Sequence, residues 1–138
     1  MIVYLDSCAV VKLIRREEYS GALAKHLASA GADMISSELT RAEVCRTLIR
    51  DGQPESTRAA SGPLLDKIAK LPVGTVIELA GDLPHRNLRT LDALHLATAQ
   101  LLGPAMTEFI TYDKRLAKAA EEAGLPLVMP GVNRAEKS

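Results

Sequence analysis

Aromatic side chains are scarce in this chain, which has no tryptophan, one phenylalanine and three tyrosines. The scarcity argues against a broad surface that stacks nucleic-acid bases on aromatic rings. Hydrophobic residues still make up 47% of the sequence, so the core of a folded protein must rest on aliphatic side chains and alanine. With 138 residues, the chain is long enough for one ordinary domain with one core.

An excess of charge of either sign is also missing. Lysine and arginine together number 17, and aspartate and glutamate together also number 17. This balance argues against a protein that binds nucleic acid by bulk electrostatics alone. It leaves room for local basic patches beside an acidic pocket.

Cysteine pairs and long apolar runs are the other absences. Cys8 and Cys45 form neither a disulfide framework nor a zinc-ligand spacing, so we expect reduced, buried thiols. No apolar run reaches the roughly 20 residues that span a bilayer. Met1 leads directly into a short apolar run and Asp6, without the pattern of a signal peptide. We therefore expect a cytoplasmic protein without a membrane segment.

Short apolar runs alternate with helical patterns along the whole sequence. This alternation predicts an α/β fold in which helices cover both faces of a parallel sheet. The expected strands are 2–5, 34–36, 75–79, 108–111 and 127–129. The expected helices are 9–14, 20–30, 37–50, 55–70 with a break or kink at Gly62-Pro63, 89–102 and 114–123. We expect a single domain over 1–130 and a polar, frayed tail over 131–138.

Four acidic residues stand at or near the starts of helical segments, namely Asp6, Glu43, Asp92 and Asp113. Asp6 and Asp113 directly follow predicted strands, and ligands of open α/β sheets bind at the carboxyl ends of the strands. Carboxylates that meet in one pocket repel each other by roughly 4 kcal/mol per close pair at an effective dielectric of about 20. Such a pocket persists only with a cation, which predicts a magnesium or manganese site.

Each acid also has an ordinary structural explanation. Asp6 and Asp113 suit N-caps, the stretch from Thr40 to Glu43 matches a capping box, and Asp92 suits a first helical turn. Two observations weaken this explanation. Glu43 and Asp92 both lie in largely apolar stretches, where a carboxylate needs a charged partner.

The phrases around the four acids are LDSCAV, LTRAEVCRTL, LDALHLATA and TYDKRL. In this order, on a chain of this length, they resemble the PIN-domain family and, within it, the VapC-type toxins of bacterial and archaeal toxin–antitoxin pairs. The resemblance runs over about 1–130. It implies a PIN-like fold with a central parallel sheet of four to five strands. It also implies a toxin endoribonuclease that needs Mg²⁺, for which Mn²⁺ substitutes.

By position, the resemblance implies that Asp6, Glu43, Asp92 and Asp113 form the catalytic acidic quartet. We expect Asp6, with Asp92 or Asp113, to contact the metal, whose activated water would attack the RNA phosphodiester. Ser7 and Thr111 each lie beside an acid and are expected either to hydrogen-bond it or to cap a helix. His95 follows Asp92 by three residues and is expected to be a packed histidine rather than a base or ligand.

The resemblance further implies three partners: an RNA substrate, a cognate VapB-type antitoxin and a second copy of the chain. Basic residues near the acids either grip RNA phosphates at the rim of the crevice or form solvated helix faces. These residues are Lys12, Arg15, Arg16, Arg86, Arg89, Lys114 and Arg115.

Three other functions compete with the ribonuclease hypothesis. A non-catalytic PIN-like RNA-binding or RNA-processing adaptor is disfavoured because all four acids are present. A phosphatase with an aspartate nucleophile after the first strand typically has a second aspartate two residues later, where this chain has Cys8. A nucleotide-binding protein would need a glycine-rich phosphate loop after a strand, and the sequence has none.

Overall fold

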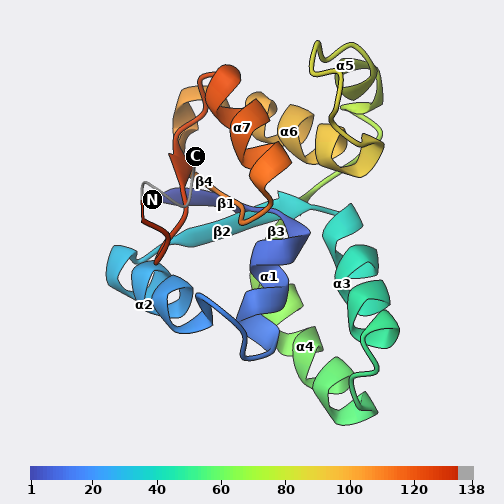
Figure 1. Ribbon diagram of the computed structural model, residues 1–138, viewed down its shortest axis with the longest axis vertical. Helices are drawn as coiled ribbons and strands as arrows, with labels where there is room; N and C mark the ends of the chain where they lie inside the picture. Colours follow the sequence, from blue (N-terminus) through green and yellow to red (C-terminus); the bar gives the residue numbers. More distant parts are fainter. Residues whose placement is uncertain (134–138) are drawn as a thin grey trace.

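The computed structural model describes residues 1–133 and has one five-stranded parallel sheet at its centre (Figure 1). The strand order is β3-β2-β1-β4-β5. The strands are β1 (Ile2–Leu5), β2 (Asp33–Ser37), β3 (Ala69–Leu71), β4 (Met106–Ile110) and β5 (Leu127–Val128). The predicted fold class, a parallel sheet of four to five strands between helices, is confirmed.

Helices cover both faces of this sheet (Figure 1). They are α1 (Ser7–Ile14), α2 (Ser20–Ala30), α3 (Leu39–Arg50), α4 (Glu55–Lys67), α5 (Ile77–Gly81), α6 (Thr90–Leu102) and α7 (Lys114–Glu122). The first four helices pack on one face, and α6 and α7 pack on the other, with α5 against α6. The predicted helices α2, α6 and α7 match within one residue at each end.

The alternation of side chains along β1 divides the core between the two faces. Val3 and Leu5 pack with α1 to α4, whereas Tyr4 packs with α6 and α7. All three side chains are fully buried. A strand buried on both faces reads as a continuous apolar run, which is why the sequence predicted β1 correctly.

The central position of β1 creates the crevice that a ligand needs. The chain passes from β1 to β2 and β3 on one side, then crosses back to β4 on the other side. The backbone N–H of Asp6 donates to the carbonyl of Ile110 at 3.3 Å, so the carboxyl ends of β1 and β4 stay together. This edge is the topological switch point of the sheet, where ligands of open α/β folds bind.

The predicted third strand, 75–79, is wrong. The strand in this part of the chain is β3, which pairs with Ile35, Ser36 and Ser37 of β2, and α5 occupies most of the predicted segment. Val76 is fully buried against α6 instead of in the sheet. Packing against a helix therefore overrides the strand preference of this β-branched segment.

Of the break or kink predicted at Gly62-Pro63, the break is wrong. Helix α4 continues through Pro63 and ends at Lys67, where the prediction had residue 70. Proline removes one backbone donor and deprives the carbonyl four residues earlier of its partner. That carbonyl belongs to Ala59, an exposed residue whose carbonyl can bond to water.

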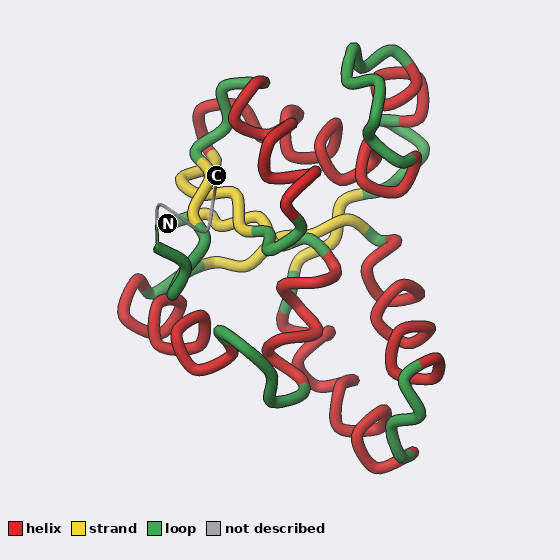
Figure 2. The backbone as a smooth tube through the Cα atoms, viewed as in Figure 1, coloured by secondary structure: helices red, strands yellow, loops and turns green. Residues whose placement is uncertain are grey.

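The chain after β5 folds back beside α2, as Figures 1 and 2 show. Pro130 is buried, and its carbonyl accepts a hydrogen bond from the Tyr112 hydroxyl at 2.7 Å. A side chain at Gly131 would meet Ala22 at 2.8 Å. Gly131, the first residue of the predicted tail, thus lies against α2, while 134–138 lie outside the described residues. Within 1–133, no helix is long and apolar enough to cross a membrane.

Candidate active site

A cavity of about 790 Å³ opens at the carboxyl ends of β1 and β4. All four predicted acids line it, each from a different element or junction. The lining residues are Asp6, Ser7, Cys8, Leu39, Ala42, Glu43, Arg46, Thr47, Arg50, Arg89, Thr90, Leu91, Asp92 and Asp113. The structure thus brings together residues that lie more than a hundred positions apart in the chain.

Asp6 is the most enclosed of the four acids, with 3% of its surface exposed. Its carboxylate caps α1 by accepting the Ala9 N–H at 3.0 Å, and it accepts the Thr111 hydroxyl at 2.6 Å. The Cys8 thiol lies 3.1 Å from both carboxylate oxygens. Burial raises the pKa of Asp6, and these hydrogen bonds offset only part of that effect. Asp6 therefore serves as the N-cap of α1 and lines the pocket at the same time.

Thr111 joins two of the acids. Besides donating to Asp6, its buried hydroxyl oxygen accepts the backbone N–H of Asp113 at 3.1 Å. Ser7 also lines the pocket, but no hydrogen bond joins its hydroxyl to a carboxylate within the described part of the chain. The neighbouring Cys8 donates to Asp6 instead, because burial and the charge of Asp6 raise the pKa of its thiol and keep it protonated. Cys8 and Cys45 are free and only partly buried, whereas the sequence predicted buried thiols.

Glu43 is held by a buried histidine. The Nε2 atom of His95 lies 2.7 Å from Glu43 Oε1, and Nδ1 lies 2.7 Å from the Tyr4 hydroxyl. Only 1% of His95 is exposed. Burial lowers the pKa of His95, but the hydrogen bond to Glu43 and the surrounding negative charges raise it more, so the net shift is upward.

This arrangement corrects two sequence-based interpretations. Helix α3 begins at Leu39 with Glu38 as its N-cap, so Glu43 lies in the second turn and the capping box is wrong. His95 is packed, as expected, but it is bonded to Glu43 and does not pair with Asp92. The sequence does contain one sign of this contact, because a histidine among the apolar residues of α6 needs a polar partner. Its partners from β1 and α3 become visible only in the folded chain.

Asp92 and Asp113 share one arginine at the mouth of the pocket. Asp113 caps α7 with Oδ1, which accepts the N–H groups of Arg115 and Leu116 at 2.9 and 3.0 Å. Its Oδ2 lies 3.6 Å from Arg89 Nη2, and Asp92 Oδ2 lies 3.5 Å from Arg89 Nε. Burial and the charge of Asp113 raise the pKa of Asp92. One oxygen of each acid therefore faces a cationic group of the chain itself.

The donor set fits a hard divalent cation. Carboxylate oxygens are the ligands that Mg²⁺ and Mn²⁺ favour, and the guanidinium between Asp92 and Asp113 marks a position that attracts positive charge. Within 1–133, no three histidine, cysteine or acidic side chains converge closely enough to enclose a metal as they stand. A cation that keeps several of its waters suits acids that line one pocket from separate walls.

The predicted basic rim is only partly present. Lys12 and Arg15 form ion pairs with Glu17 at 3.2 and 3.0 Å, so these two cations support the turn after α1 and do not line the pocket. Arg89 does line it, and Arg46 lies one helical turn after Glu43 on the same wall. Arg46 was not among the predicted basic residues, because the sequence does not show that this face of α3 forms a wall of the pocket.

Comparison with known proteins shows the family of this chain. Residues 3–122 match the PIN domain model, and the chain belongs to the PIN-domain family. The chain is 45% identical over 129 residues to ribonuclease VapC46 of Mycobacterium tuberculosis, covering 93% of this chain and 97% of that protein. It is 41% identical over 137 residues to ribonuclease VapC35 of the same species, covering 96% of this chain and 100% of that protein.

Solved structures share the fold at lower identity. The Mycobacterium tuberculosis toxin VapC20, which cleaves the sarcin–ricin loop, superposes with a TM-score of 0.68 at 18% identity, covering 89% of this chain and 95% of that one. The VapBC2 complex of Rickettsia felis with a promoter DNA fragment contains a chain with a TM-score of 0.70 at 14% identity, covering 94% of this chain and 99% of that one. These likenesses establish the PIN-type architecture.

Proposed function

We infer that this protein is a VapC-type toxin that hydrolyses RNA phosphodiester bonds as a metal-dependent endoribonuclease. The observation that carries the inference is the meeting of Asp6, Glu43, Asp92 and Asp113 in one pocket at the switch point of the sheet. Relatives named ribonuclease VapC, up to 45% identical over nearly the whole chain, support it. The catalytic unit is the single domain over 1–130.

Asp6, Asp92 and Asp113 are the residues that would hold Mg²⁺ or Mn²⁺. When bound, the cation neutralises charge on the phosphodiester and makes water a stronger nucleophile. Asp6 is oriented for this role by Thr111 and the Ala9 N–H. Because burial raises the pKa of Asp6, a positive charge beside it would stabilise the ionised carboxylate.

Glu43 would take the proton of the attacking water. Its Oε1 atom is bonded to His95, which leaves Oε2 to accept that proton. His95 is held in turn by the Tyr4 hydroxyl, so the carboxylate has a fixed orientation toward the pocket. His95 is thus a positioning residue.

Arg46 and Arg89 would bind the RNA phosphates next to the acids. Both line the pocket, and the Arg89 side chain is 70% exposed, so it is free to exchange its contacts with Asp92 and Asp113 for a phosphate. A VapB-type antitoxin and a second copy of the chain are the protein partners that go with a VapC toxin.

The decisive experiment is an RNA-cleavage assay with purified, antitoxin-free protein. Total cellular RNA is incubated with Mg²⁺, with Mn²⁺ and with EDTA, beside the Asp6→Asn variant and the matched surface variant Asp66→Asn, whose side chain is 73% exposed. We expect discrete fragments from the wild type and Asp66→Asn in either metal, and none from Asp6→Asn or in EDTA. Absence of cleavage in every condition would favour the non-catalytic RNA-binding alternative.

A further inference from the structure

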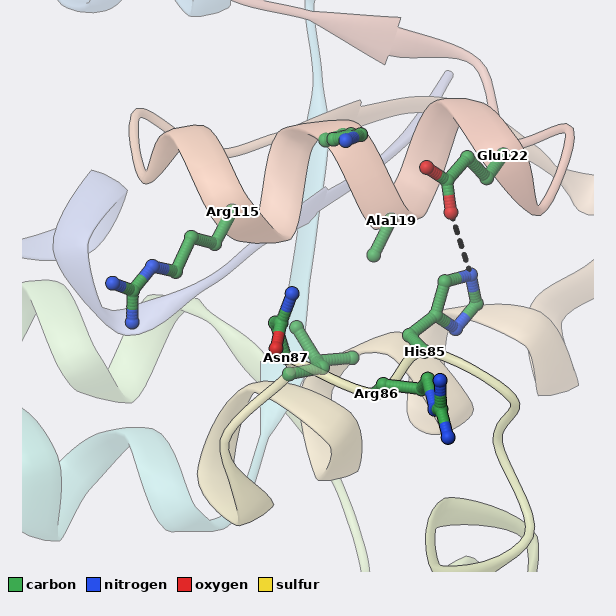
Figure 3. Close-up of a pocket in the computed structure, with 8 residues that line it drawn as sticks. His85, Arg86, Asn87, Arg115, Ala119 and Glu122 are labelled. Carbon is green, nitrogen blue, oxygen red and sulfur yellow. Dashed lines mark ion pairs between the residues drawn. The ribbon is translucent and has the colours of Figure 1, made fainter.

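A second pocket, of about 520 Å³, lies between α7 and the loop that joins α5 to α6 (Figure 3). One wall is formed by residues of α7 and the other by the loop. The lining residues are His85, Arg86, Asn87, Leu88, Arg115, Lys118, Ala119 and Glu122. The residues of the acidic pocket are absent from this set, so the two cavities are distinct.

The charge of the second pocket suits an anion. Arg86, Arg115 and Lys118 are exposed, and none of them forms an ion pair with another residue of 1–133. The one acid of the lining, Glu122, faces His85, with 3.6 Å between Oε2 and Nε2 (Figure 3). Three unpaired cations around one hollow repel each other, and a polyanion that enters the hollow relieves this repulsion.

His85 provides a second sign of an incomplete site. Its Nδ1 atom is the single buried side-chain nitrogen or oxygen within the described residues that has no hydrogen-bond partner. Buried polar atoms are almost always paired with protein or ordered water. An unpaired imidazole nitrogen in the wall of a basic pocket therefore fits a site that binds a polar ligand and its associated water.

Both walls of this pocket continue into the acidic pocket. The loop that carries His85 and Arg86 ends at Arg89, which contacts Asp92 and Asp113. Helix α7 begins directly after Asp113 and carries Arg115 and Lys118. At a rise of about 1.5 Å per residue, Lys118 lies about 8 Å beyond Asp113 along the helix axis. A strand bound at the acids therefore needs only a short continuation to reach the basic pocket.

We propose that this pocket binds backbone phosphates of the RNA substrate on one side of the bond that is cut. The proposal rests on the ribonuclease function proposed above. The lining contains no phenylalanine, tyrosine or tryptophan that would stack a base, so the contribution is to affinity and register and not to base sequence. An acidic peptide is the other polyanion of this kind, but continuity with the acidic pocket favours RNA.

The test is the salt dependence of RNA binding. A labelled single-stranded RNA is titrated by fluorescence anisotropy with protein in a Glu43→Gln background, which keeps the proposed metal-holding acids and leaves the RNA intact. The double variant Arg115→Gln/Lys118→Gln is compared with the matched control Lys25→Gln/Arg58→Gln, which removes two exposed cations from α2 and α4. Each lost phosphate contact lowers the slope of log K against log salt by about 0.7 for a single strand.

We expect the slope to fall by about 1.4 and the affinity at low salt to fall about tenfold or more in Arg115→Gln/Lys118→Gln, with no change in the control. Equal behaviour of the two double variants would overturn the proposal. The proposal would also be overturned if Arg115→Gln/Lys118→Gln bound RNA as before but no longer bound polyglutamate, which would indicate an acidic peptide as the ligand. Unchanged RNA binding together with a changed oligomeric state in gel filtration would overturn it as well. If the double variant melts at a lower temperature, the single variants serve, each with an expected slope change of about 0.7.

The subsite and the ribonuclease function fail separately. If the two double variants show the predicted slope difference but wild-type protein never cuts RNA, the subsite is sustained and the nuclease is refuted. Wild-type protein that cuts RNA with Mg²⁺, while Arg115→Gln/Lys118→Gln binds and cuts equally well, would sustain the nuclease and refute the subsite.

Discussion

The two halves of the acidic pocket are held in different ways. Asp6 and Glu43 are bonded to buried groups, Asp6 to Thr111 and Glu43 to His95. Asp92 and Asp113 instead turn their Oδ2 atoms to Arg89, whose side chain is 70% exposed. The inner half is therefore built before any ligand arrives, whereas the outer half holds an exposed cation that can leave the acids for a phosphate or give way to a metal.

This difference suggests a division of labour. Hydrogen bonds to buried groups fix the orientation of the inner carboxylates. The burial itself lowers stability, because it disfavours the charged form of each carboxylate. An exposed ion pair changes the stability of the fold little, and this allows the outer acids to exchange partners. Variants that break the inner half should therefore have larger effects than variants that break the outer half.

The largest effect is expected for Asp6→Asn. Cleavage should fall at least about 100-fold, because the loss of charge on a proposed direct ligand should exceed the roughly 10- to 100-fold cost of losing an outer-shell partner. The fold should persist, since asparagine also caps helices. Cleavage is measured with Mg²⁺ on the fragments mapped for the wild type, and near-normal activity would contradict the assignment of Asp6.

The same variant makes a prediction about pH and stability. The pKa of Asp6 is raised by burial above its ordinary value of 3.8, so the ionised form disfavours the metal-free fold. Its stabilising contribution is complete below the unfolded pKa and is lost as pH rises through the folded pKa. Asp6→Asn should therefore melt higher than the wild type at neutral pH without metal, and this difference should shrink toward pH 4. A lower melting temperature of Asp6→Asn at neutral pH would contradict the sign.

A second, smaller effect is expected for His95→Leu. Cleavage should fall about 10- to 100-fold because Glu43 loses the partner that orients it. The unfolding free energy should fall by about 1–3 kcal/mol because the Tyr4 hydroxyl loses its partner. Tyr4→Phe is the matched control, since it should lower stability while leaving His95 bonded to Glu43 and most activity intact. Equal loss of activity in both variants would mean that His95 acts only through the core.

Thr111→Val should have an intermediate effect through the metal. The variant keeps the side-chain shape but removes the hydroxyl that donates to Asp6 and accepts from Asp113. Magnesium affinity, measured by calorimetry, should fall about tenfold. Thr107→Val, at an exposed position on β4, is the matched control and should bind Mg²⁺ as the wild type does. Unaltered affinity in Thr111→Val would show that the hydroxyl serves packing alone.

The smallest effect, and one of opposite sign, is expected for Arg89→Gln. An exposed ion pair is worth at most about 1 kcal/mol, so removal of this competing cation should strengthen Mg²⁺ binding by no more than about fivefold. The measurement is a magnesium titration without RNA. Weaker binding would show that Arg89 orients Asp92 and Asp113 and does not compete with the metal.

The sequence predicted those parts of the molecule in which local pattern and tertiary role agree. Asp6 follows a strand that reads as a buried apolar run, Asp113 follows β4, and both acids line the pocket as expected. The prediction of a strand at 75–79 is wrong because the apolar side chain of Val76 is buried against α6, and local strand propensity does not report such a tertiary contact. The predicted break at Pro63 is wrong because the helix loses only one hydrogen bond there, at the exposed residue Ala59.

The contacts that orient Glu43 were beyond the reach of the sequence. Tyr4, Glu43 and His95 come from β1, α3 and α6, and none of their local patterns predicts the others. The same holds for Arg46 and for the basic pocket between α7 and the α5–α6 loop. Sequence motifs can locate single functional residues. The hydrogen bonds that orient those residues depend on which helices and strands become neighbours in the fold.

The most direct test of the account is a calorimetric titration of Mn²⁺ into wild-type protein, Asp6→Asn and the surface control Asp66→Asn. The account predicts saturable binding to the wild type and to Asp66→Asn with equal affinity, and binding at least about tenfold weaker to Asp6→Asn. Equal affinity in all three proteins, or no binding to the wild type, would contradict the claim that these carboxylates form a metal site.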